Sequence, residues 1–494
     1  MIDNRQQHPF SSLENILLIL FSLPVIVFIA GWFHLPAALL AVLGLILVLR
    51  RALYSQGEGC AIRDLSAWDW GLIVLAAVLW VSLSGTGGIG FQNWDHEKHN
   101  AMLNDLVRKD WPVRYESGRL LLVYYLPYYL IPAAVGKAAG WAAANFLLWL
   151  QLLLFVALTL AWLAKRVEAR GRLCVLAAVL LFVYFSGCDW VGIAYEKGPP
   201  GFPAHIEWWT RFNYLSITSQ LFWVPNSAVA SWVGTALFLD ALERRSLLRS
   251  FLVWLLTLFW CPYAAAGMLP FLLVLRASAV GWKEFLCTDW KWAFGAFPAL
   301  VLAIAFYTSK SASIPLEAAW MHASDIRGFA IDYIKLLGLH VLWAVPFLWY
   351  FKRKIGIGNE LWRLFLIACG VLVVLPVSIA PGISDFIMKA SMPPILAFAL
   401  VFIAVIIQFL RAPQGSPSRS RRSRLVMSIL MVIYLVGSLT AVHEIGRSIL
   451  RYQARTPGFC REDCLPALKP DYVYRQYTSE GNSLLRLMLR DSVP

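Results

Sequence analysis

The chain has 494 residues, of which 59% are hydrophobic and only 15% are charged, and its mean hydropathy is +0.64. A soluble domain of this length cannot hide so much apolar surface, so the composition excludes a soluble globular protein and predicts one that lies in lipid. The formal charge of +14 is gathered in short clusters between apolar runs, which indicates membrane topology and argues against nucleic-acid binding.

Apolar runs recur from Ile16 to Val442, and about 20 helical residues are enough to cross a bilayer. The runs lack the two-residue alternation of a membrane barrel, so an all-α membrane protein is predicted. The first run does not end in a cleavage site, and we interpret it as a retained span rather than a signal peptide. The predicted spans lie near residues 14–33, 35–49, 70–86, 141–164, 173–187, 221–239, 293–307, 333–351, 361–378, 391–410 and 425–442.

The orientation of these spans is predicted from the basic residues, because Lys and Arg concentrate in cytoplasmic loops. The sequence then describes a multi-pass protein of a bacterial inner membrane, with a cytoplasmic N-terminus and an extracytoplasmic C-terminus. The basic clusters that define this map lie at residues 50–51, 165–172, 244–249, 352–354 and 419–424.

Two apolar segments do not fit a simple count of spans. A crossing at Leu120 to Val135 would place the basic cluster at 165–172 outside, so this segment is expected to lie along or dip into the outer face. Conversely, Phe251 to Leu275 must cross an even number of times, which predicts two short helices that break at Cys261 and Pro262. The expected bundle has about thirteen transmembrane helices, each needing about 20 residues to cross alone.

This map divides the chain into a transmembrane domain, residues 1–442, and a short extracytoplasmic tail, residues 443–494. The domain carries two long extracytoplasmic loops, at 86–140 and 188–220, and a smaller one at 308–332. The cytoplasmic loops are short and basic, and no phosphate-binding glycine motif lies between a strand and a helix. Nucleotide chemistry on that side is therefore not expected.

The loop at 86–140 holds the densest group of ionisable residues. It leaves the third predicted span through glycines, and a predicted helix over 96–109 follows. Acids, imidazoles and a lysine at the lip of a bundle can hold a charged substrate, although Asp95 could simply cap that helix. The candidate residues are Asp95, His96, Glu97, Lys98, His99, Asn100 and Asp105.

This loop resembles the first extracytoplasmic loop of the GT-C class of membrane glycosyltransferases. That class has an acidic motif, an amphipathic helix, a Trp-Pro segment and an interfacial helix that ends in Lys-x-x-Gly. The counterparts here are Asp95-His96-Glu97, AMLNDLVRKDWPVRY and LLVYYLPYYLIPAAVGKAAG, over about 80 residues. The acidic pair of the class is usually DE, ED or DxD, so Asp95-x-Glu97 departs from the pattern and leaves the role of Glu97 open.

The resemblance implies a GT-C-like bundle that transfers a sugar from a polyprenyl-phosphate donor to a glycan, lipid or protein acceptor. Asp95 would act as the general base, with Glu97 as the second acid of the motif. Lys98, His99, Asn100 and Asp105 would contribute to substrate binding. The remaining candidates for binding the donor phosphate are Lys389 and, less securely, Arg211 and Arg327.

Several of these residues also have interpretations other than sugar transfer. Lys389 and Asp385 are four residues apart and could pair only with each other. His96 and Glu97 could hold a divalent metal, although no metal-binding spacing is present. Trp190, Trp208 and Trp209 could stack on sugars, but tryptophans at a membrane border are often interfacial anchors.

Other functions remain open at this point. A polymerase or ligase of lipid-linked glycans would share the orientation but rely on arginines. A transporter or flippase would place charges in broken helices at mid-membrane, and only the Cys261-Pro262 break suggests this. A non-catalytic scaffold would not need the cluster of residues 95–99.

Cys460 and Cys464 lie in the extracytoplasmic tail, in the stretch PGFCREDCLPAL. That side of the membrane is oxidising, and a turn at residues 461–463 would bring the two sulfur atoms together. We expect a disulfide between them, with two free thiols as the alternative.

Overall fold

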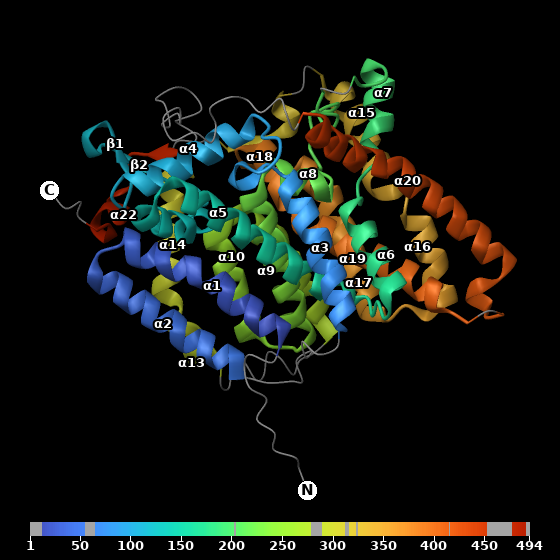
Figure 1. The fold of residues 1–494 in the computed structure, drawn as a ribbon, viewed down its shortest axis with the longest axis horizontal. Coiled ribbons are helices and arrows are strands. Elements are labelled where there is room, and N and C mark those ends of the chain that lie inside the picture. The colour runs from blue at the N-terminus through green and yellow to red at the C-terminus, as the bar shows by residue number, and fades with distance from the viewer. Residues whose placement is uncertain are drawn as a thin grey trace, which may run out of the picture.

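The computed structural model describes residues 12–54, 65–201, 204–277, 289–311, 316–322, 325–413, 415–451 and 477–490. They form a bundle of helices with short strands at its edge (Figure 1). The helices are α1 Leu13–Trp32, α2 Leu35–Tyr54, α3 Ala67–Leu83, α4 Asp95–Arg108, α5 Pro127–Arg166, α6 Arg172–Val183, α7 Asp189–Lys197, α8 Ile217–Trp223, α9 Pro225–Glu243, α10 Leu247–Trp260, α11 Pro262–Met268, α13 Trp290–Gly295, α14 Phe297–Ser311, α15 Ile326–Leu337, α16 Val345–Phe351, α17 Asn359–Val374, α18 Ile383–Ala390, α19 Met392–Arg411, α20 Arg421–Leu450 and α22 Ser483–Met488. The strands are β1 Arg114–Tyr115, β2 Leu120–Leu122, β3 Leu316–Ala318, β4 Ile379–Pro381 and β5 Thr478–Ser479.

The protein is an all-α membrane protein. Seven described helical segments are long and apolar enough to cross a bilayer, and five further apolar helices are shorter. The predicted total of about thirteen spans is not confirmed. Among the long helices α19 is buried almost all round, which places it inside the bundle, whereas α2 exposes much of its apolar surface.

The segment Leu120 to Val135, which topology had excluded as a span, contains strand β2 and the start of α5. A kink at Gly140 divides α5, because this residue has φ 86° and ψ 177°. Glycine adopts that backbone conformation without the steric conflict that a Cβ atom would cause. An initial helix therefore precedes the apolar stretch that starts at Trp141, as the sequence predicted.

The second irregular segment breaks where the sequence predicted. Helix α10 ends at Trp260, and Cys261 has extended backbone angles before Pro262 starts α11. Proline is well suited to the first position of a helix because its missing N–H would have no partner there.

The predicted span at 221–239 differs from the structure, since α8 and α9 meet at a break at Val224.

The basic clusters gather at one end of the bundle, which we call the basic end. Contacts tie the clusters at 165–172 and 244–249 to each other and to the start of α1 and the end of α19. They join Arg249 with Asn15 (2.8 Å), Arg244 with Glu14 (3.9 Å), Arg166 with Glu243 (3.1 Å) and Arg411 with Glu168 (3.1 Å). The cluster at 419–424 joins them, because Arg419 donates to the carbonyl of Leu410 at 3.4 Å. If these clusters are all cytoplasmic, as the positive-inside rule predicts, they must lie at the same end of the bundle.

The C-terminal segment folds back onto the first long loop at the opposite end. Strands β1, β2 and β5 form an antiparallel sheet in that order, with Leu121 opposite Ser479. The N–H of His34 donates to the carbonyl of Met488 at 2.9 Å, so this segment also contacts the α1–α2 turn. Helix α20 continues past the predicted domain border after Val442, to Leu450, and the division into two domains stays a prediction. Cys460 and Cys464 lie outside the described residues, and their disulfide stays a prediction.

The two ends of α20 are expected to lie on opposite sides of the membrane. Its 30 residues rise about 45 Å, which exceeds the hydrocarbon thickness of about 30 Å. A fluorescent reporter that works only in the cytoplasm should be active after Arg424, and a phosphatase that works only after export should be active after Pro494. The same reporter active at both positions would contradict the orientation.

Candidate functional site

Helix α4 starts the site, and Asn93 sets its first turn. The Oδ1 atom of Asn93 accepts from the backbone N–H of Asp95 at 3.1 Å and from Nδ1 of His96 at 3.1 Å. Its Nδ2 atom donates to the carbonyl of Phe222 at 2.8 Å, which fixes the amide orientation. The alternative in which Asp95 only caps this helix does not hold, because Asp95 is its first residue and Asn93, two residues earlier, accepts from its N–H.

Asp95 forms an ion pair with Lys98 one turn further along. The Asp95 Oδ1 and Lys98 Nζ atoms are 3.0 Å apart, and 29% and 19% of the two side chains are exposed. The carboxylate is thus held in place while it stays accessible. Glu97 lies two residues from Asp95, about 200° around the helix, and its side chain is exposed. The structure does not bring Glu97 to the side of the helix where Asp95 lies.

His99 is buried and fixes α4 to its neighbours. Its Nε2 atom must donate to the carbonyl of Trp223 at 3.2 Å, so Nδ1 accepts from the hydroxyl of Tyr129. Burial, followed by the charge of Lys98, lowers the pKa of His99 well below its usual value. His99 is therefore neutral at pH 7, and both of its ring nitrogens are already used within the protein.

Asn100 and Asp105 point into the protein as well. Asn100 Nδ2 donates to Gln92 Oε1 at 2.9 Å, which ties the helix to the glycine-rich turn before it. Asp105 accepts from the Tyr115 hydroxyl at 2.7 Å and lies ten residues from Asp95, a helical rise of about 15 Å. These contacts place both residues in the framework of the loop.

The second part of the site lies on α18, where Lys389 and Asp385 form the pair that their spacing predicted. Their Nζ and Oδ2 atoms are 2.6 Å apart. The lysine side chain is only 3% exposed, but 58% of the aspartate side chain is exposed. Lys389 Nζ also lies 5.0 Å from the centre of the Tyr125 ring, and an aromatic face stabilises a buried cation.

Helices α4 and α18 converge on the same tyrosines, although nearly 300 residues separate them. Burial raises the pKa of Tyr124 to about 12, and the positive charges of Lys389 and Lys98 act against that rise. The pKa of His99 is likewise lowered in part by both lysines. The geometry agrees, because Lys389 lies over Tyr125, whose ring stacks on Tyr124 at 4.4 Å, and His99 of α4 bonds Tyr129. Both helices that carry an ion pair therefore contact the tyrosine-rich segment 124–129.

Two further residues of this site were missed in the sequence. Lys310, near the end of α14, has its Nζ atom 5.7 Å from the Tyr124 ring and 5.8 Å from the Tyr477 ring. Its position just beyond an apolar run, on the predicted outer side, was a signal that could have identified it. Tyr477 comes from the C-terminal segment, and no local pattern points to it.

The two arginine candidates are not brought to this site by the described contacts. Arg211 Nε donates to Asp332 Oδ2 at 2.9 Å, which ties the loop before α8 to α15. Arg327 is exposed on α15. Both therefore belong to the neighbourhood of α15 rather than to the Asp95 and Lys389 pairs.

The residues around Asp95 do not form a recognisable metal site. Within the described ranges, no three His, Cys, Asp or Glu side chains lie close enough to hold an ion. His96 is buried, Glu97 is exposed, and the two are consecutive on a helix. Their geometry gives no support to the metal interpretation.

Acid is expected to destabilise the protein through His96. Burial lowers the pKa of His96 from 6.5 to about 4, although the charge of Asp95 raises it in part. Between these values the unfolded chain binds a proton that the folded chain does not, so stability falls as the pH falls. The loss is about 2 kcal/mol at pH 5 relative to pH 7. The His96→Asn variant keeps an amide that can donate to Asn93 but does not titrate. Its unfolding temperature should therefore fall less between pH 7 and pH 5 than that of the native protein does. Equal falls in the two proteins would contradict this prediction.

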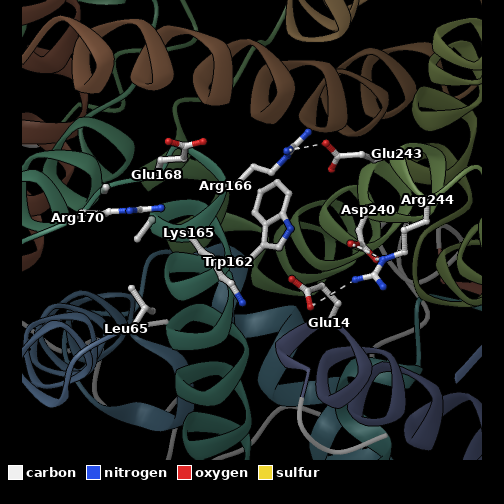
Figure 2. Close-up of a pocket in the computed structure, with 12 residues that line it drawn as sticks. Glu14, Leu65, Trp162, Lys165, Arg166, Glu168, Arg170, Asp240, Glu243 and Arg244 are labelled. Carbon is white, nitrogen blue, oxygen red and sulfur yellow. Dashed lines mark hydrogen bonds and ion pairs between the residues drawn. The ribbon is translucent and has the colours of Figure 1, made fainter. Parts of the chain in front are cut away.

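A cavity of about 750 Å³ lies at the basic end, far from the Asp95 site. Figure 2 shows charged side chains around it, and Arg166 and Arg244 point toward Glu243 and Glu14. Along α5, Trp162 in its wall is separated from Trp141 by a rise of about 30 Å. The arginines there neutralise nearby acids, and the cavity has no part in the site described above.

Comparison with known proteins adds no family to this description. No family, curated protein or solved structure matches the chain. The resemblance of the first long loop to the GT-C class therefore remains a hypothesis. It is supported by the sequence motifs and by the geometry of α4 and α18.

Proposed function

We propose that the protein transfers a sugar from a polyprenyl-phosphate donor to an acceptor at the extracytoplasmic face of the membrane. The observation that carries this proposal is the convergence of two ion pairs, Asp95 with Lys98 and Asp385 with Lys389, at the end of the bundle opposite the basic clusters. An accessible carboxylate beside several lysines suits a reaction that removes a proton and releases a phosphate.

In this reaction Asp95 accepts the proton of an acceptor hydroxyl. The freed oxygen attacks the anomeric carbon of the donor sugar, and the bond between that carbon and the phosphate oxygen breaks. The electron pair of that bond remains on the departing polyprenyl phosphate. Attack from the face opposite the phosphate inverts the anomeric configuration. Lys98 holds the carboxylate in position until the acceptor arrives.

The lysines Lys98, Lys310 and Lys389 would stabilise the phosphate as its negative charge grows. The lysine ammonium group is a compact positive charge that donates hydrogen bonds to phosphate, and its attraction is strongest where water is excluded. Lys389 meets that condition because its side chain is buried. His99, being neutral, supports this site by holding α4 against Tyr129 and Trp223.

The direct test is to purify the protein with its bound lipid and incubate it with a panel of polyprenyl-phosphate sugars and candidate glycan, lipid and protein acceptors. We expect release of polyprenyl phosphate together with an acceptor that carries one added sugar of inverted configuration. Donor that stays intact with every acceptor would contradict the proposal.

Transport is the second candidate, and one contact favours it. The break at Cys261 lies beside the charged helix α18, since Tyr263, two residues after the break, packs edge-on against Phe386 of α18 with ring centres 5.5 Å apart. Broken helices next to charged groups are typical of transporters. Movement of an intact lipid-linked sugar across proteoliposomes, with no chemical transfer, would favour this alternative.

A further inference from the structure

Two exposed tryptophans stand beside the Asp95 site. Trp94 directly precedes Asp95 and is 63% exposed, and Trp208, from the loop between α7 and α8, is 43% exposed. Their ring centres are 5.5 Å apart and the ring planes differ by 35°. Two neighbouring indole rings that remain open at a surface form a binding face more often than isolated apolar residues do. We call this pair the tryptophan platform.

The platform is held from below by a buried aromatic residue and an imidazole. The Trp223 ring meets Trp94 edge-on at 6.4 Å and Trp208 at 5.6 Å. His205 packs between, with its ring centre 4.8 Å from Trp208 and 4.3 Å from Trp223. These contacts limit the rotation of the two exposed rings, so a ligand would meet a surface that is already ordered.

Ionised groups under the platform fix this arrangement. Glu444 of α20 accepts from Trp223 Nε1 at 3.1 Å and contacts Arg447 at 3.0 Å, and its other oxygen meets His205 Nδ1 at 2.8 Å. Lys197 Nζ donates to the carbonyl of Trp208 at 3.1 Å. The platform thus rests on a network that links α7, α8 and α20.

The chemistry around the platform suits a sugar better than a lipid chain. A pyranose ring has an apolar face of C–H groups, which an indole face attracts, and hydroxyl groups around its edge. Asp95 and Lys98 lie in the first turn of α4, directly after Trp94, and both are partly exposed, so they are open to such hydroxyls. An acyl chain in the same place would desolvate this ion pair without offering it a new hydrogen-bond partner.

We propose that the tryptophan platform binds a sugar ring of the acceptor, so that the acceptor is a carbohydrate. This inference rests on the proposed function, because it places the acceptor hydroxyl next to the proposed base. Trp94 directly precedes Asp95, with Cα atoms about 3.8 Å apart, so a sugar on Trp94 would be held at the start of the helix turn that carries the proposed base. The aromatic faces give affinity and Asp95 selects the reacting hydroxyl.

The test measures oligosaccharide binding without any donor. The full chain is placed in nanodiscs, since maltoside detergents would compete, and saturation-transfer NMR is recorded with maltotetraose, chitotetraose and mannotetraose. The variants are Trp94→Ala, Trp208→Ala and the double variant. Trp68→Ala is the matched control, because Trp68 is 69% exposed but stacks on Arg172, a residue of the basic clusters.

We expect the native protein to bind at least one of the three probes, and the double variant to bind it at least about tenfold more weakly. Trp68→Ala should bind as the native protein does, and Trp94→Phe should retain part of the affinity because it keeps an aromatic face. Folding of each variant is checked by its unfolding temperature.

Two results would overturn the inference. One is absence of binding by the native protein to all three probes. The other is unchanged binding in the double variant, which would assign the two rings to membrane anchoring. A protein that binds sugars through the platform but transfers none would refute the proposed function alone, and a transferring protein whose binding ignores the platform would refute this inference alone.

Discussion

The Asp95→Asn variant is expected to lose sugar transfer by on the order of a hundredfold to ten-thousandfold, which is the usual effect of removing a general base. Asn has nearly the same shape as Asp but carries no charge and does not accept the proton. The fold should survive, because the Asp95 side chain does not cap α4, its backbone N–H still donates to Asn93, and the carboxylate is partly exposed. The measurement is the initial rate of transfer with the natural donor and acceptor, beside the unfolding temperature.

Glu97→Gln is the matched control for this prediction. Glu97 is an acid on the same turn of the same helix, and its exposed side chain lies on the opposite side from Asp95. It should retain transfer within about threefold, as is typical of surface substitutions away from a site. Robust turnover by Asp95→Asn would remove the main reason for describing the protein as a glycosyltransferase.

Lys389→Met should reduce transfer about a hundredfold, comparable to the loss of one electrostatic donor at a developing negative charge. Methionine fills similar space in the buried site, so the packing against Tyr125 is largely kept. Asp385 would lose its partner, but more than half of its side chain is exposed and water can solvate the charge. The kinetic measurement should vary the donor concentration, because the donor carries the phosphate.

A double variant separates phosphate binding from simple pairing. If Lys389 only neutralises Asp385, then Lys389→Met combined with Asp385→Asn should restore activity, since both charges are gone. If Lys389 contacts the phosphate, the double variant should be as slow as Lys389→Met. Lys389→Arg should recover only part of the rate, because a planar guanidinium does not replace a compact ammonium group. Restored turnover in the double variant would exclude Lys389 from the site.

Much of the bundle could be predicted because hydropathy and turn chemistry act locally. The break at Cys261 follows from one proline, and the kink at Gly140 follows from one glycine. The helix over residues 95–108 follows from its spacing of apolar side chains. Breaks such as the one at Val224 were missed, since an apolar run reads as one span whether or not the backbone turns within it.

The site could be predicted only in part. Asp95 and Lys98 were found because ionisable residues crowd one loop, and Lys389 was found because a cation near a span needs an explanation. Asp105 and His99 belong to the same crowded loop, but their helical positions turn them into the protein, where Tyr115 and Tyr129 bind them. Residue type alone does not reveal which side of a helix becomes buried.

The sequence by itself determined that the chain is an all-α membrane protein, and it located the acidic loop, because composition and helical periodicity depend on neighbouring residues only. The tertiary structure decided which distant groups are brought to the acidic loop and the tyrosines beside it. Lys389, Lys310 and Tyr477 come from α18, α14 and the C-terminal segment, and Trp208 comes from the loop before α8. Their meeting depends on how distant helices pack and on a strand that pairs with β2 across more than 300 residues. Such contacts are set by the complementary shapes of whole elements, which no local pattern records.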